Sequence, residues 1–359
     1  MLKRYVMVTN DGSHFPELVT PLDKITRPGS YQWYKAFMAD PEWTGEVRHI
    51  KTLSHDELRK YDLVHINLCG ANLNLVEHVR RTIEGSRAKL ILNVDYPPDS
   101  PHFREAFYNP NTFLLALFQA DFIFAQEPYQ QALLTYLINH TRVVGAKNPF
   151  LNRDLKVPLI PHPVNVRQLK SLRVPLEERQ DRLIYIFHRY ERQQHIPGWL
   201  TLKLKIPTGE YIPRYMVNFL PDERLKDIVA PFFLFDYCGS IASEANWGKY
   251  IYTLAHSTLG FEYYVSVHSH GRFPSECACL GLPCVGTDRS YSVTRLFPKI
   301  CHDPLDLEGI RSSLERLLTD ERFYREVVEY ADKAVEELSW AESKARLLGE
   351  MERWGITFE

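Results

Sequence analysis

One carboxylate in the sequence is set apart by the residues around it. Glu276 lies in the stretch HSHGRFPSECACLGLPCVGT, residues 268–287. Small residues follow it as far as Gly281, a residue type that often ends a helix, and Pro283 comes just beyond, where a stopped helix commonly has one. The apolar residues after that proline predict a short buried strand. The two oxygens of a carboxylate accept hydrogen bonds from neighbouring hydroxyls, so Glu276 is suited to bind a vicinal diol such as that of a ribose.

The residues before Glu276 predict how it is positioned. FEYYVSV, residues 261–267, alternates and is rich in aromatic and β-branched side chains, which favours a strand. SECACLG, residues 275–281, then predicts a helix with Glu276 near its N-terminus, at the carboxyl edge of a sheet. Open α/β sheets bind ligands at that edge. The alternative is that Glu276 only stabilises the first turn of its helix.

Cations nearby are candidates for binding phosphate. Arg189 and Arg192 follow the apolar run at residues 183–187, and Arg272 comes four residues after His268. Positive charge at such places, like the amides of a helix N-terminus, stabilises the charge that builds on a departing diphosphate. The alternative for Arg189 and Arg192 is a solvated pair, and Arg272 competes with them for the same role.

Histidines are the candidates for proton transfer. His65 comes at the end of a predicted strand and His14 follows the first one, and each is a candidate acceptor-side base because histidine titrates near neutral pH. His268 and His270 face the same way on an extended segment, but no third metal ligand accompanies them. We therefore interpret His268 as a sugar or phosphate contact. For each histidine the alternative is a structural role.

These residues sit among alternating strand and helix patterns, which predict βαβ units and mostly parallel sheets. The first series holds five predicted strands, and a second begins near residue 182. Pro158, Pro161 and Pro163 fall between the two series and predict a linker. With 359 residues the chain is expected to form two domains with a ligand-binding cleft between them. The predicted strands of the first series are KRYVMVTND, DLVHINLCG, AKLILNVDYPPD, DFIFAQE and TRVVGA.

Composition excludes several classes of function. A formal net charge of −2 gives no basic footprint for nucleic acid and no polybasic membrane signal. The sequence has neither a secretory signal nor a window of 18 apolar residues, so we expect a cytoplasmic protein and leave peripheral membrane contact open. The six cysteines form no C-x-x-C pair and are expected to be reduced, partly buried thiols.

The segment around Glu276 resembles the donor site of GT-B glycosyltransferases, in particular the large retaining family with the motif Glu, seven residues, Glu. Gly271 also matches a glycine inside the motif, whereas His268 stands where the family has its first glutamate. Further stretches resemble the family in the same order along the chain. They are DLVHINL, ADFIFAQEPYQQALL, VPLIPHPVN and LIYIFHRY. Glu276 matches the second glutamate, and Gly281, Pro283 and Val285 match the residues that follow it in the family.

The resemblance implies a GT-B fold, in which two Rossmann-like, doubly wound α/β domains face a central cleft. Residues 1–165 would bind the acceptor, residues 180–340 the nucleotide sugar, and residues 341–359 would form a helix returning to the first domain. The reaction would be transfer of a sugar from a nucleotide-diphosphate donor to an acceptor hydroxyl, with retention and without a catalytic metal or other cofactor. The acceptor, whether glycan, lipid, protein or small molecule, is not identified by the sequence.

Two alternatives remain at this stage. One is a nucleotide-sugar epimerase on the same fold, which would need carboxylates near the anomeric carbon. The other is a GT-B domain that binds a glycan or a partner protein without catalysis, which the replacement of the first glutamate by His268 favours.

Overall fold

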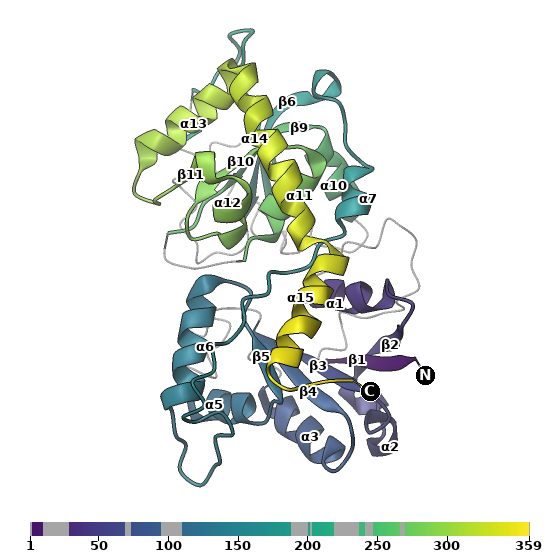
Figure 1. Cartoon of the computed structure of the whole chain (residues 1–359). Helices are drawn as coiled ribbons and strands as arrows, with labels where there is room; N and C mark the ends of the chain where they lie inside the picture. The colour runs from purple at the N-terminus through teal and green to yellow at the C-terminus, as the bar shows by residue number, and fades with distance from the viewer. Residues whose placement is uncertain are drawn as a thin grey trace. The chain divides into compact units, whose positions relative to one another are not determined.

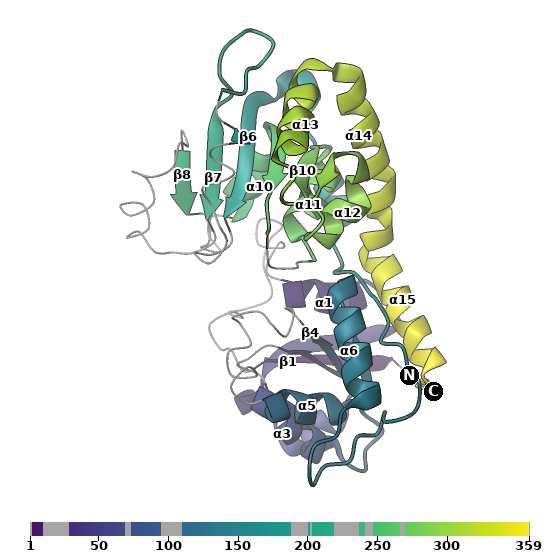
Figure 2. The ribbon, with the colours of Figure 1, turned by 90° about the vertical axis from the view of Figure 1, so that its left-hand side faces the viewer.

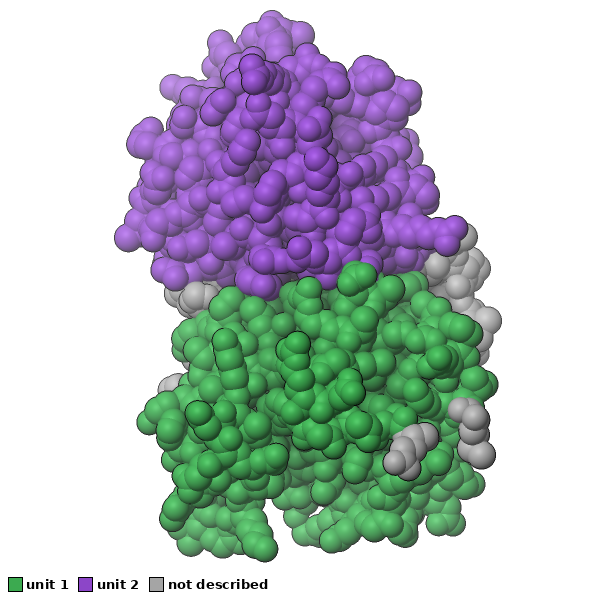
Figure 3. Space-filling view, viewed as in Figure 1, with its two compact units in different colours: residues 1–19, 28–163, 340–359 green, residues 20–27, 164–339 purple. Residues whose placement is uncertain are grey.

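The computed structural model describes residues 2–9, 29–68, 73–94, 110–187, 200–201, 203–218, 237–240, 247–265 and 270–358. They form two compact units (Figure 3). Unit 1 contains the described residues up to Pro163 together with residues 340–358, and unit 2 contains those from Val164 to Ser339. Four of the predicted site residues lie outside the described residues: His14, Arg189, Arg192 and His268.

Unit 1 is built on a parallel sheet of five strands in the order β2-β1-β3-β4-β5. With strands numbered along the chain this is the flavodoxin-like order, whose ligand-binding switch point lies between β1 and β3. The strands are β1 (Lys3–Thr9), β2 (Trp43–His49), β3 (Leu63–Leu68), β4 (Lys89–Val94) and β5 (Phe122–Phe124).

Helices cover both faces of this sheet. One face packs against α3 (Leu73–Ile83), α5 (Pro110–Phe118) and α6 (Pro128–His140) through an aliphatic core. The other packs against α1 (Gly29–Met38) and the C-terminal helix α15 (Trp340–Arg353), which lie side by side in Figure 1, through a more aromatic core. A short helix, α2 (His55–Leu58), precedes β3. The last helix of the chain is thus part of the core of unit 1.

Unit 2 contains a parallel sheet of six strands in the order β11-β10-β9-β6-β7-β8. Figure 2 shows β6, β7 and β8 following one another toward one edge. Numbered along the chain this is the Rossmann order 3-2-1-4-5-6, with the switch point between β6 and β9. The strands are β6 (Gln180–Phe187), β7 (Arg214–Asn218), β8 (Tyr237–Ser240), β9 (Ser257–Glu262), β10 (Cys284–Thr287) and β11 (Cys301–His302).

The helices of unit 2 pack on this sheet in one apolar cluster. Capping accounts for several of their boundaries. Asp306 accepts from the backbone amide of Gly309 at the start of α13, and Asp320 accepts from that of Phe323 at the start of α14. The helices are α7 (Val166–Lys170), α10 (Trp247–Ala255), α11 (Arg272–Leu280), α12 (Tyr291–Leu296), α13 (Leu307–Thr319) and α14 (Glu321–Ala334).

The alternating α/β pattern is confirmed, with differences at some boundaries. The predicted strand TRVVGA is wrong, because residues 141–146 form a loop and a turn. The predicted strand at residues 261–267 is shifted, because β9 begins at Ser257 and ends at Glu262. The long C-terminal helical pattern is divided by a 3-10 turn at Val335–Leu338, so that α14 belongs to unit 2 and α15 to unit 1.

Candidate functional site

The start of α11 is fixed by a glycine. Gly271 precedes the helix with φ +72°, and a Cβ on this residue would lie 2.3 Å from the hydroxyl oxygen of Ser290 and 3.3 Å from a carboxylate oxygen of Glu262. Both the left-handed backbone and the lack of space therefore favour glycine. Glu262 is the last residue of β9 and is buried, so the N-terminus of α11 lies at the carboxyl edge of the sheet, beside a strand of the switch point.

The carboxylate of Glu276 is held by two protein groups. Nε of Arg272 donates to Oε1 at 2.8 Å, one turn earlier in α11, and the phenol of Tyr250 on α10 donates to Oε2 at 2.7 Å. Glu276 is only 4% exposed. Burial raises the pKa of this carboxyl, while Arg272 and the Tyr250 hydrogen bond act in the opposite direction. The arrangement orients a carboxylate whose oxygens still have lone pairs for a ligand.

Two aspects of this geometry differ from the sequence-based expectation. Glu276 was expected near the helix N-terminus, but α11 begins at Arg272 and Glu276 is its fifth residue. The expectation was wrong because Arg272 and Phe273 extend the helix backward to the left-handed Gly271. Sequence reasoning also missed Tyr250, and the signal available was a tyrosine on the apolar, buried face of an amphipathic helix. The predicted helix end at Gly281, with φ +70°, is confirmed.

His65, the predicted acceptor-side base in unit 1, lies in the core on the α1 side of the sheet. Its Nδ1 is 2.7 Å from the Tyr5 hydroxyl, and its Nε2 is 2.7 Å from Oδ1 of Asn93. Burial lowers the pKa of His65 to about 4, so the ring is neutral at neutral pH. Both ring nitrogens are engaged with protein groups, an arrangement that supports a positioning role, and action as a base stays a prediction.

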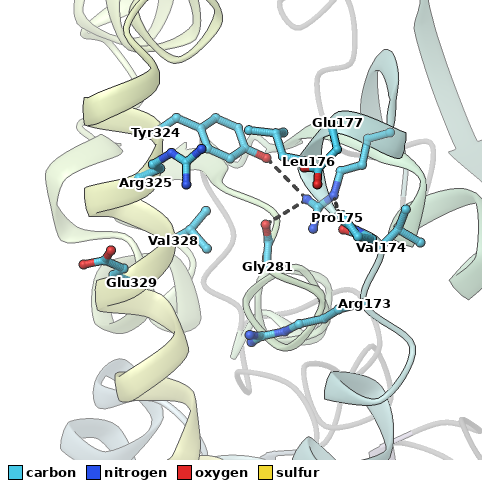
Figure 4. A pocket seen from close by; sticks show the side chains of 11 residues that line it. Arg173, Val174, Pro175, Leu176, Glu177, Gly281, Tyr324, Arg325, Val328 and Glu329 are labelled. Carbon is cyan, nitrogen blue, oxygen red and sulfur yellow. Dashed lines mark hydrogen bonds between the residues drawn. The ribbon is translucent and has the colours of Figure 1, made fainter.

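A pocket of about 440 Å³ in unit 2 (Figure 4) does not have Glu276 among its lining residues. It is bounded by the segment 173–179, by Gly281 and by α14, at the amino ends of β6 and β10. Two arginines of the pocket are hydrogen-bonded to the protein backbone. Arg173 donates to the carbonyl of Cys279, and Arg179 donates to the carbonyls of Leu280 and Gly281. These bonds satisfy the last carbonyls of α11. The arginines of this pocket therefore stabilise the C-terminal end of α11, and the pocket is not the predicted donor site.

Other site classes find no support in the described part of the chain. Among those residues there is no group of three or more His, Cys, Asp or Glu placed to hold a metal ion. Cys277, Cys279 and Cys284 are buried free thiols, and burial raises the pKa of each. No helix in the described segments has the length and apolar character needed to cross a bilayer.

Comparison with known proteins identifies the fold. No family model matches the chain, and no curated protein sequence does. Solved structures do match over nearly the full length. "Trehalose-6-phosphate from E. coli bound with UDP-2-fluoro glucose" has a TM-score of 0.68 at 11% identity and covers 99% of this chain and 100% of its own. An alpha-glucosyltransferase in complex with UDP gives 0.66 at 12%, with coverages of 99% and 100%.

The alpha,alpha-trehalose 6-phosphate synthase from Burkholderia multivorans gives a TM-score of 0.63 at 11% identity, covering 99% of this chain and 97% of its own. Identities this low establish a shared architecture and no more. Together with the two Rossmann-like sheets described above, they show that this chain has the GT-B fold.

Proposed function

We propose that this chain is a glycosyltransferase that transfers a sugar from a nucleotide-diphosphate donor, with UDP as the nucleotide, to an acceptor hydroxyl. The observation that carries the proposal is the Arg272–Glu276–Tyr250 arrangement on the helix that follows β9, at the switch point of unit 2. The UDP and UDP-sugar bound in similar structures support the choice of donor. Retention of configuration and independence from metal ions are the finer parts of the proposal.

Each residue of this arrangement has a chemical task. Glu276 accepts hydrogen bonds from the ribose hydroxyls of the donor through the lone pairs that Arg272 and Tyr250 do not use. The first amides of α11 and the positive end of its dipole favour the diphosphate. Arg189, Arg192 and His268 keep their predicted contacts with the phosphates and sugar, and His14 keeps its predicted role as acceptor-side base.

Calorimetric titration with UDP, UMP and GDP tests the donor site. Wild type should bind UDP more tightly than UMP, because UMP lacks the second phosphate. Glu276→Ala should weaken UDP binding by about ten-fold or more, since it removes one or two hydrogen bonds to a charged group. The matched control is Glu326→Ala, which alters a partly exposed glutamate on α14 in the same unit. Equal UDP affinity in folded wild type and Glu276→Ala would contradict the donor-site assignment.

Turnover separates the proposed activity from its alternatives. UDP release from UDP-glucose should depend on an added acceptor, here a panel of neutral sugars and sugar phosphates, and the anomeric coupling constant of the product reports retention. Conversion of the donor to an isomer without acceptor would instead indicate an epimerase. Tight UDP binding without any transfer would indicate a binding protein. A chelator should leave the rate unchanged if no metal takes part.

A further inference from the structure

Neutral polar side chains replace aromatic ones toward the carboxyl edge of the unit 1 sheet, on the face covered by α1. His65 and Asn67 are on β3, Asn93 is on β4, and Gln126 comes just after β5. His65, Asn93 and Gln126 are each at most 1% exposed, and Asn67 is partly buried. His65 and Asn67 share a face by alternation, and strand register pairs Asn67 with Asn93.

The hydrogen bonds among these residues run in one direction. Oδ1 of Asn93 can only accept, so Nε2 of His65 must carry the proton, and Nδ1 must then accept from the hydroxyl of Tyr5. Nδ2 of Asn93 donates in turn to Oδ1 of Asn67 at 2.6 Å. The amide of Asn67 is therefore oriented with its oxygen toward Asn93.

Buried polar atoms beside this chain lack partners. Within the described residues, neither amide atom of Gln126 nor Nε1 of Trp33 has a hydrogen-bond partner. Gln126 follows Phe124 by two residues, and the Phe124 ring packs edge-on against Trp33 with centroids 5.1 Å apart. Register pairs Phe124 with Asn93, so Gln126 and Trp33 are neighbours of these hydrogen-bonded side chains. An unpaired buried polar group destabilises a fold. A ligand that forms a hydrogen bond with this group would remove that destabilisation.

The place and chemistry of this cluster suit one kind of ligand. The Tyr5–His65 bond crosses from β1 to β3, which is the switch point of the sheet. Gln126 and Trp33 supply neutral donors and an acceptor without a formal charge. Amides that both donate and accept match hydroxyl groups, which do the same. A phosphate or a carboxylate would need cations instead.

We propose that Gln126 and Trp33 form an acceptor subsite in unit 1 that binds the hydroxyl groups of an uncharged polyol or sugar. The hydrogen bonds that link Tyr5, His65, Asn93 and Asn67 fix the polar side chains beside this subsite. The inference rests on the proposed glycosyltransferase function and adds the substrate class of its acceptor side.

Two variants with opposite expected behaviour test it. Gln126→Met keeps the side-chain length and removes the unpaired amide, so the free protein should melt at the same or a higher temperature. The apparent acceptor KM for a neutral sugar should nevertheless rise about ten-fold, with the KM for UDP-glucose unchanged. The control, Asn139→Leu, removes a buried amide on α6 that bonds the backbone of Leu155. It should lower the melting temperature and leave the acceptor KM unchanged.

A measurement without turnover keeps the inference separate from the proposed function. In protein labelled with 5-fluorotryptophan, the ¹⁹F resonance of Trp33, assigned with Trp33→Phe, should shift on titration with glucose, galactose, mannose or myo-inositol. The shift should be lost in Gln126→Met and kept in Asn139→Leu. If UDP binds but no polyol moves this resonance, or if Gln126→Met responds as wild type does, the acceptor subsite is wrong. Failure of UDP to bind contradicts the proposed function on unit 2 instead.

Discussion

The phenol of Tyr250 donates a 2.7 Å hydrogen bond to the Glu276 carboxylate, although the two residues lie on different helices and are both buried. Arg272 approaches the other oxygen of the same carboxylate. One cation and one neutral donor therefore favour the ionised form of Glu276, against the burial that raises its pKa.

Removing the Tyr250 hydroxyl should change the pH dependence of nucleotide binding. Tyr250→Phe takes away a group that lowers the pKa of Glu276, so this pKa should rise further. Because the protonated carboxyl accepts ribose hydrogen bonds poorly, UDP affinity should decline with falling pH earlier in the variant than in wild type. Calorimetry from pH 8 to pH 5 measures both midpoints, and coincident midpoints would leave Tyr250 without this role. Tyr252→Phe, at an exposed position on the same helix, is the control.

Gly271 should tolerate alanine far less well than another left-handed glycine of unit 2. A Cβ at Gly271 would meet Ser290 at 2.3 Å, whereas Gly209, with φ +90°, has nothing within 4 Å of such a Cβ. Gly209→Ala should cost about 1 kcal/mol of unfolding free energy from the backbone alone. Gly271→Ala adds a steric clash and should cost roughly 2–4 kcal/mol. Urea unfolding measures the loss of unfolding free energy in each variant. Equal losses would show that the residues around Gly271 move aside to accommodate the added methyl group.

The neutral, buried His65 should make unit 1 sensitive to acid. Burial lowers its pKa from the ordinary histidine value of about 6.5 to about 4, so between these pH values the unfolded chain binds a proton that the folded chain does not. Stability contributed by neutral His65 is complete above pH 6.5 and is lost as the pH falls toward 4. The loss amounts to about 3 kcal/mol.

The measurement for His65 is a difference between two proteins. Urea unfolding measures the stability of wild type and of His65→Gln at pH 7 and at pH 4.5. The pH-dependent contribution of the carboxylates is common to both proteins and drops out of the difference. The stability gap between them should narrow or reverse at the lower pH. A gap independent of pH would mean that His65 is protonated in the folded state.

Met351 of α15 should be as important to unit 1 as a residue of its sheet. It is fully buried against the aromatic core formed with α1. Met351→Ala should cost about 2–5 kcal/mol of unit 1 stability, while UDP binding to unit 2 should persist. Glu352→Ala, at the next and exposed position, should cost little. A Met351→Ala protein as stable as wild type would contradict the packing of α15 described above.

Much of the fold was predictable because parallel strands are buried on both faces and therefore show as apolar runs. RYVMV in β1, LVHINL in β3 and KLILNV in β4 are of this kind. β2 was missed because WTGEVRH is an edge strand with only two buried residues, Trp43 and Val47. Its pairing with β1 is a long-range contact that local sequence does not encode.

The candidate site was predictable only where its signal is local. Glu276 and Gly281 were found because helix and helix end lie within one short stretch. Tyr250 is 26 residues away on another helix, and no spacing rule connects it to Glu276. The contact of Asn93 with Asn67 likewise depends on the register of β4 on β3, which tertiary structure sets.

The position of α15 has a consequence for co-translational folding. Leu347 and Met351 complete the core of unit 1, yet they are translated after the described residues of unit 2, which run from 164 to 339. Domains usually fold in the order of synthesis, N-terminal first. Here the sheet of unit 1 is synthesised first, but its α1 face is incompletely covered until α15 follows. By then all the described core residues of unit 2 have been synthesised. Until α15 has been synthesised, part of the apolar α1 face of unit 1 therefore stays exposed on the nascent chain.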